Sequence, residues 1–158
     1  MNSEINHIQG HMDGRGHRIG IIVSRFNSLV TDQLYNGAED TLLRHGVSPS
    51  DITVVHVPGA YEIGVVAKRL AARKDIDAVI CLGAVIRGDT PHFDFVAAEA
   101  SRAVSSASEH TGKPVAFGVL TTETVDQALQ RAGVKGGNMG ANCAQTAVET
   151  VNILRTLS

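Results

Sequence analysis

The sequence has little of several features that would identify a specialised class of protein. It has two cysteines, Cys81 and Cys143, which are far apart in apolar stretches, so we expect reduced core residues rather than a disulfide or a metal site. No apolar run approaches the about 18–20 residues that a membrane-spanning helix needs. The first residues also lack the pattern of a signal peptide. We therefore expect a cytoplasmic protein that does not act at a membrane.

Charge and common cofactor motifs are equally scarce. The formal net charge is −2, without a basic stripe, so the sequence gives no support to nucleic-acid binding. The sequence lacks the glycine motifs that bind dinucleotides or phosphates. It also lacks a nucleophile elbow and the spacing of zinc ligands. The histidines near the N-terminus, His7, His11 and His17, are loosely spaced, and we expect no metal there.

What the chain does have is an alternation of buried-type strands and amphipathic helices. Its 158 residues suit one domain with a real core. Strands are expected at 19–23, 52–57, 78–82 and 114–120. Helical spacing of apolar residues predicts helices around 30–42, 63–70, 96–107, 125–132 and 144–154. We therefore predict an α/β fold: a three-layer αβα sandwich with a flavodoxin-like, four-stranded parallel sheet over residues 19–158. Residues 1–18 form a tail that is either mobile or pairs with a neighbouring subunit.

The stretch from Ala78 to Asp94 is the most informative part of the chain. We expect the strand to leave the sheet at Gly83 and a helix to begin after Thr90, with Thr90 as its cap and Pro91 in its first turn. The free N–H groups of such a helix start favour an anion. His92, in the first turn, is then well placed to move protons near a bound phosphate.

Other polar and aromatic residues also fall in loops at the carboxyl edge of the predicted sheet, where α/β folds bind ligands. Each has two interpretations. Phe26 either stacks on a planar ring or fills the core, and Glu62 either accepts from ligand hydroxyls or compensates a helix dipole. Arg131 and Lys135 are compatible with a ligand site or with a solvated helix end. A similar cap, which we expect at Thr122, begins the helix that carries Arg131.

Five motifs, in this order, resemble those of the 6,7-dimethyl-8-ribityllumazine synthase family. They are residues 24–27 (SRFN), 57–63 (VPGAYEI), 82–94 (LGAVIRGDTPHFD), 117–123 (FGVLTTE) and 130–133 (QRAG) with Lys135. The resemblance covers nearly all of the chain from Ile19 onward. It implies condensation of 5-amino-6-(D-ribitylamino)uracil with 3,4-dihydroxy-2-butanone 4-phosphate, the penultimate step of riboflavin biosynthesis, without a metal or organic cofactor.

The resemblance also implies roles for individual residues. His92 would be the catalytic proton-transfer residue. Contacts with the ribitylaminouracil are implied for Phe26, Asn27, Ala60, Tyr61, Glu62, Ala84, Val85, Ile86, Phe117 and Lys135. The phosphate would be held by Asp89, Thr90 and Arg131. Of these, Phe117, Arg131 and Lys135 would come from the adjacent subunit.

The family builds homopentamers, which in some members form decamers or sixty-subunit shells, and an association with riboflavin synthase is compatible with the resemblance. The turn at 133–138 has no insertion, which favours shells, but Val134 and Gly136 depart from the pattern of shell-forming members. Two alternatives to the enzyme remain open. One is a flavodoxin-like module that binds a phosphorylated ligand without turnover, and the other is a scaffold with a degenerate site.

Overall fold

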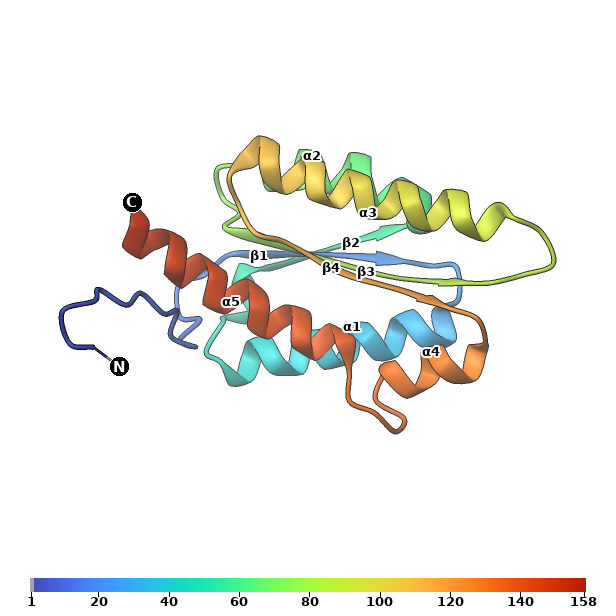
Figure 1. The fold of residues 1–158 in the computed structure, drawn as a ribbon, viewed down its shortest axis with the longest axis horizontal. Coiled ribbons are helices and arrows are strands. Elements are labelled where there is room, and N and C mark those ends of the chain that lie inside the picture. Colours follow the sequence, from blue (N-terminus) through green and yellow to red (C-terminus); the bar gives the residue numbers. More distant parts are fainter. Residues whose placement is uncertain (1) are drawn as a thin grey trace.

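Four parallel strands form the centre of the structure, a computed structural model that describes residues 2–158 (Figure 1). Their order across the sheet is β2-β1-β3-β4. The strands are β1 (Ile19–Ser24), β2 (Ile52–Val57), β3 (Ala78–Ile86) and β4 (Val115–Thr122). β1 pairs with both β2 and β3, and β3 also pairs with β4, so β2 and β4 are the two edges.

Helices cover both faces of this sheet (Figure 1). On one face lie α1 (Ser28–Arg44), α4 (Val125–Arg131) and α5 (Met139–Leu157). On the other lie α2 (Ile63–Ala71) and α3 (His92–Thr111). The short 3₁₀ helices are η1 (Pro49–Asp51) and η2 (Ala60–Glu62). The predicted three-layer α/β fold is therefore confirmed.

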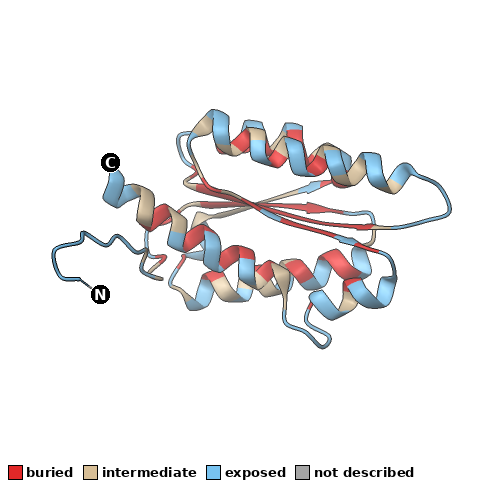
Figure 2. Ribbon diagram, viewed as in Figure 1, coloured by how far each residue is buried: buried red, intermediate tan, exposed pale blue. Residues whose placement is uncertain are grey.

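The core consists of two apolar clusters, one on each face of the sheet. Every residue of β1 is buried, as is all of β3 except its last residue, because both strands are covered by helices on two sides (Figure 2). Cys81 and Cys143 are free thiols in this core, as predicted, and burial raises the pKa of Cys143 to about 11. Among residues 2–158, no helix is long and apolar enough to cross a membrane.

The strand order explains where a ligand can enter. The chain passes from β1 outward to β2 and then crosses back over β1 to β3. The loops that follow β1 and β3 therefore diverge to opposite faces, which leaves an opening between them at the carboxyl edge. The loop after β4 lies at the free edge of the sheet.

Three predicted boundaries are wrong. β3 does not end at Gly83 but continues to Ile86, and Gly83 pairs with Val119 of β4. A side chain at Gly83 would come within 3.1 Å of Ser24 Oγ and 3.2 Å of Ile63 Cδ1, so this glycine permits close packing rather than a turn. Its type alone could not distinguish these two uses.

The predicted helix caps are displaced by one or two residues. Pro91, not Thr90, is the residue before α3, and no side chain caps that helix. Thr122 is the last residue of β4, and Thr124 instead caps α4 by accepting a hydrogen bond from the Gln127 N–H. Neighbouring threonines compete for a cap, and the longer strands decide which one is in position.

The segment before β1 runs along the C-terminal helix. Residues 2–9 extend beyond the domain, whereas residues 10–18 pack against α5 and the end of α1 (Figure 1). Gly14 donates a backbone hydrogen bond to His45 (2.7 Å), and the Asn152 amide donates to the carbonyl of His11 (2.7 Å). The second half of the predicted tail is thus packed on the domain, and pairing of the tail with a neighbouring subunit stays a prediction.

Candidate active site

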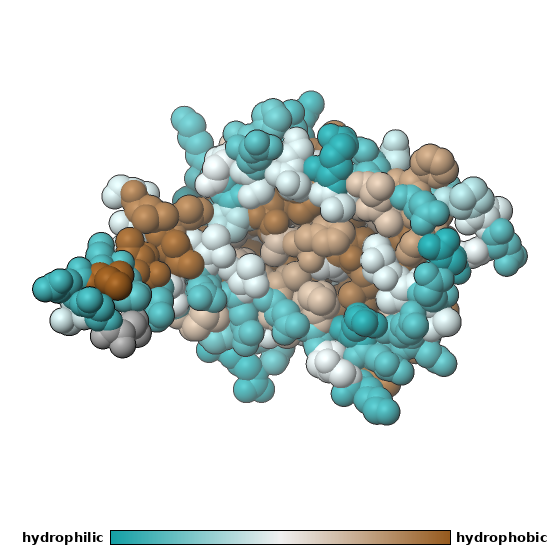
Figure 3. All heavy atoms as spheres, in the orientation of Figure 1, coloured by the Kyte–Doolittle hydropathy of each residue, from teal (hydrophilic) through white to brown (hydrophobic). Residues whose placement is uncertain are grey.

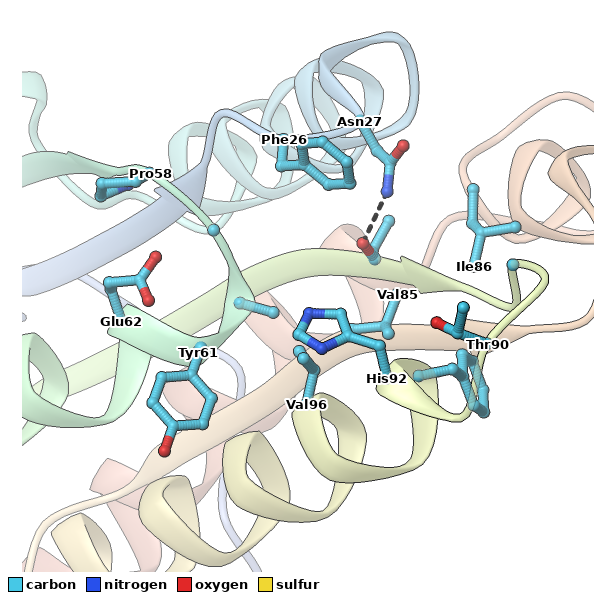
Figure 4. Close-up of a pocket in the computed structure, with 15 residues that line it drawn as sticks. Phe26, Asn27, Pro58, Tyr61, Glu62, Val85, Ile86, Thr90, His92 and Val96 are labelled. Carbon is cyan, nitrogen blue, oxygen red and sulfur yellow. Dashed lines mark hydrogen bonds between the residues drawn. The ribbon is translucent and has the colours of Figure 1, made fainter.

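A cavity of about 620 Å³ opens at the carboxyl edge of the sheet, between the loops that follow β1, β2 and β3 (Figure 4). Its wall is built from short segments of all three loops. The lining residues are Phe26, Asn27, Pro58, Gly59, Ala60, Tyr61, Glu62, Ala84, Val85, Ile86, Gly88, Thr90, His92, Phe93 and Val96. The position agrees with the ligand site expected at the switch point of a doubly wound sheet.

The loop after β1 presents an aromatic ring to this cavity. The backbone N–H of Phe26 donates to the Pro58 carbonyl (3.1 Å), which holds the loop against the end of β2. The Phe26 side chain is 72% exposed, so the interpretation as a core residue is wrong. Asn27 adopts a left-handed backbone conformation, with φ of 63°, and its amide donates to the Ala84 carbonyl (2.9 Å). Asn27 thereby ties the ring-bearing loop to β3.

The turn after β2 supplies polar groups on a second side. Tyr61 and Glu62 lie in η2, immediately before α2. Among residues 2–158, neither side chain forms a hydrogen bond or an ion pair with another residue. An uncommitted carboxylate beside a cavity is available to accept hydrogen bonds from a ligand. The geometry therefore suits a ligand that carries hydroxyl groups.

The third side consists of the end of β3 and the start of α3. Ala84, Val85 and Ile86 give a narrow apolar floor, and His92, the first residue of α3, extends its imidazole over it (Figure 4). Gly88 and Thr90 line the cavity between them. Asp89 belongs to the same loop and is exposed, but it is not among the lining residues. The amino end of α3 faces this loop and favours an anion.

Three other predicted site residues lie outside this cavity. Phe117 and Arg131 line a second hollow of about 340 Å³ along β4, α4 and the start of α5, together with Glu123. Phe117 is 39% exposed at this free edge of the sheet. Lys135 is exposed in the turn before α5 and lines neither space. Within one chain, the structure thus gathers most of the predicted residues around His92 and leaves Asp89, Phe117, Arg131 and Lys135 outside this cavity.

Some lining residues did not emerge from the sequence. Phe93 and Val96 line the cavity, although the periodicity of α3 assigned Val96 to the inner face of a helix. Arg87, at the start of the β3–α3 loop, stacks over the Phe93 ring, with 4.5 Å from its guanidinium carbon to the ring centroid. The position of Phe93 next to His92 in the sequence was the available signal for it, whereas Arg87 was expected as part of an anion loop with Gly88, Asp89 and Thr90 and does not itself line the cavity.

Fold and cavity together define a class: a doubly wound α/β protein with a cavity of mixed apolar and polar lining next to a helix start that favours anions. Comparison with models of known families gives the particular one. Residues 16–155 match the family described as 6,7-dimethyl-8-ribityllumazine synthase, and the chain belongs to that family. The family is one of transferase-type enzymes of riboflavin biosynthesis.

Proposed function

We propose that the chain condenses 5-amino-6-(D-ribitylamino)uracil with 3,4-dihydroxy-2-butanone 4-phosphate to give 6,7-dimethyl-8-ribityllumazine, phosphate and water. One observation carries the proposal. Residues from three separate family motifs, at Phe26, Tyr61–Glu62 and Ala84–His92, converge on a single cavity in a chain of this family. Residues so distant in sequence would have no reason to meet around a cavity if their only role were local.

The apolar part of the cavity suits the pyrimidine. The exposed ring of Phe26 faces the cavity above the floor formed by Ala84–Ile86, so a planar ring can stack between them (Figure 4). Backbone groups at the end of β3 are then close to the ring edge. The free Glu62 carboxylate, beside Tyr61, accepts hydrogen bonds from the ribityl hydroxyls.

The phosphate belongs at the opposite end of the cavity, near the start of α3. Backbone N–H groups at Gly88–Thr90 and the positive end of the helix dipole favour an anion there. Asp89 and Thr90 form the loop, and Arg131 of an adjacent subunit contributes the positive charge. Arg131 suits this role because it forms no ion pair with any residue in the described part of the chain.

His92 transfers protons during the reaction. The uracil amine attacks the butanone carbonyl, so the chain need not supply a nucleophile. Loss of water gives an imine, and loss of phosphate then leaves an enol that becomes a ketone. The ribityl-bearing nitrogen attacks this carbonyl and releases a second water, which closes the second ring. Each step moves a proton, and a positioned imidazole serves as both donor and acceptor near neutral pH. Holding the two substrates face to face supplies much of the remaining acceleration.

The complete site is formed by two chains in a homo-oligomer built from pentamers. The separation between the two hollows supports this, because Phe117 and Arg131 do not line the cavity that contains His92. Apolar side chains also gather between the two helical layers on the surface drawn in Figure 3, where a neighbour can cover them. A neighbour's Phe117, Arg131 and Lys135 would then close the open side of the cavity.

One experiment separates this proposal from its two alternatives. The purified protein is mixed with both substrates, and the absorbance of the lumazine product is followed. Many turnovers per site support the enzyme. Stoichiometric binding without turnover indicates a binding module, and the absence of both binding and turnover indicates a scaffold. Light scattering on the same sample gives the size of the assembly.

A further inference from the structure

Arg87 is the first residue after β3 and begins the loop that leads to His92. Its backbone N–H donates to the Thr122 carbonyl at the end of β4 (2.9 Å). The β3–β4 pairing ends at Ile86 and Thr122, so this bond continues the sheet contact by one more residue. The start of the loop is therefore fixed to the sheet.

The side chain of Arg87 reaches the other end of the same loop. Its Nε lies 2.7 Å from Oε2 of Glu123, and its Nη2 lies 3.3 Å from Oδ1 of Asp94 in the first turn of α3. The guanidinium also stacks over the ring of Phe93, with 4.5 Å from its carbon to the centroid. One side chain thus contacts both residues that follow His92 and joins them to the end of β4.

The start of α3 has few other polar constraints. Pro91 precedes the helix, no side chain caps it, and Thr90 is exposed. Among residues 2–158, the side-chain hydrogen bonds and ion pairs of residues 87–94 are all made by Arg87. Apolar packing of Phe93 and Val96 against the core sets the course of α3, and this guanidinium supplies the polar side-chain contacts of its first turn.

We propose that Arg87 is a positioning residue, which holds the first turn of α3 so that His92 and Phe93 face the cavity. The proposal rests on the proposed function only for its effect on the reaction. Lysine cannot replace arginine fully at this position, because an ammonium lacks the planar fork that contacts two carboxylates and stacks on a ring.

The experiment uses the assembled protein and two measurements on Arg87→Met. Hydrogen exchange of the backbone amides at 88–96 should become roughly fivefold faster or more, while exchange in α5 stays unchanged. The rate constant kcat should fall about 10- to 100-fold, because a small displacement of a catalytic group is costly. In a His92→Ala background, the same substitution should have less than about a twofold further effect, because residues that act as a unit are not additive. For Arg87→Lys, both the exchange rate at 88–96 and kcat should lie between the values of the parent protein and of Arg87→Met.

Arg44→Met is the matched control, because it breaks an exposed ion pair with Asp40 (2.9 Å) on α1, and both measurements should match the parent protein. Unchanged exchange at 88–96 in Arg87→Met would overturn the proposal, as would an equal loss of kcat with and without His92. Faster exchange with an unaltered kcat would also overturn it. If the parent protein shows no turnover, the proposed function fails, and hydrogen exchange still decides whether Arg87 holds the helix start.

Discussion

The His92 imidazole extends into the large cavity and forms no hydrogen bond with another residue of the described chain (Figure 4). Removing it in His92→Ala deletes the proton donor and acceptor but leaves the surfaces that hold the substrates. We expect kcat to fall by about 10²–10⁴-fold while measurable turnover remains, since orientation of the two substrates still contributes. Initial rates of lumazine formation across a range of pH provide the measurement.

A matched control for this substitution is His56→Ala. His56 is an exposed histidine on the edge strand β2 and is not among the residues that line the cavity. Its replacement should leave the rate unchanged. If His92→Ala retained the full parental rate over the whole pH range, the assignment of proton transfer to His92 would be wrong.

Packing between α2 and α3 sets the distance between two sides of the cavity, since η2 with Glu62 leads into α2 and His92 begins α3. Gly64 of α2 lies directly against Ala103 of α3, and a side-chain carbon at Gly64 would collide with the Ala103 Cβ. Gly64→Ala should therefore push the helices apart and lower the free energy of unfolding by about 1–3 kcal/mol. Urea denaturation at one fixed protein concentration measures the change.

A compensating variant distinguishes this contact from a general loss of stability. Ala103→Gly alone should cost about 1 kcal/mol through helix propensity. Combined with Gly64→Ala, it removes the colliding carbon, so the double variant should be more stable than the sum of the two single changes predicts. Strictly additive losses would mean that the two helices do not meet at this point.

The segment before β1 contains a buried histidine whose protonation opposes folding. His17 is 1% exposed, and its Nε2 lies 2.9 Å from Oδ1 of Asn152. The Asn152 amide nitrogen already donates to backbone carbonyls of the segment, so this oxygen accepts and Nε2 carries the hydrogen. The other ring nitrogen, Nδ1, lies 3.2 Å from Nη1 of Arg155 and accepts from it. The native contacts therefore require a neutral imidazole.

Burial, followed by the nearby charge of Arg155, lowers the pKa of His17 below its usual value of 6.5, although Asp77 and Asp13 act in the opposite direction. Below about pH 6.5 the His17 imidazole is protonated in the unfolded chain but stays neutral in the folded chain. The free energy of unfolding therefore decreases on acidification. We expect the urea concentration at the unfolding midpoint to decrease as the pH is lowered from 8 to 5.5. The decrease should be smaller in His17→Gln and in Arg155→Met. Equal pH dependence in all three proteins would contradict this account.

At the level of elements, the sequence predicted the strands that are fully buried and missed the element boundaries that depend on contacts with other elements. β1 and β3 were predictable because continuous apolar runs are typical of strands covered on both faces. The true end of β3 was not, because Gly83 has the same identity whether it turns the chain or admits Ile63 and Ser24 at close range. The cap of α4 depended likewise on how far β4 extends, which pairing with β3 determines.

At the level of the whole molecule, the site could be predicted only in part. Loops at the carboxyl ends of parallel strands must share one edge, which brings Phe26, Glu62 and His92 together from the sequence pattern alone. The pattern could not reveal that the loop after β4 faces a different hollow, because that depends on the strand order β2-β1-β3-β4. The role of Arg131 in a neighbour's site came from the family resemblance and stays a prediction.

A mixing experiment tests the shared site, because His92 and Arg131 of one chain line different hollows. His92→Ala and Arg131→Met are each purified, dissociated, mixed in equal amounts and reassembled. In a ring, a site can combine the cavity of an Arg131→Met chain with the second hollow of a His92→Ala chain, and such a site has both functional residues. Random assembly should produce this combination at about one quarter of the sites.

The mixture should therefore recover roughly a quarter of the parental rate, well above the average of the two separate variants. The control is the double variant His92→Ala with Arg131→Met, mixed with the parent protein in the same way. This mixture produces the same fraction of fully functional sites, but one of its two components is fully active before mixing. Both mixtures should converge on the same rate if reassembly is complete. A mixture of the single variants that stays at their average rate would contradict the shared site. Either Arg131 takes no part in the reaction, or His92 and Arg131 act within one chain. The second case would require a large movement of α4 that brings the two hollows together.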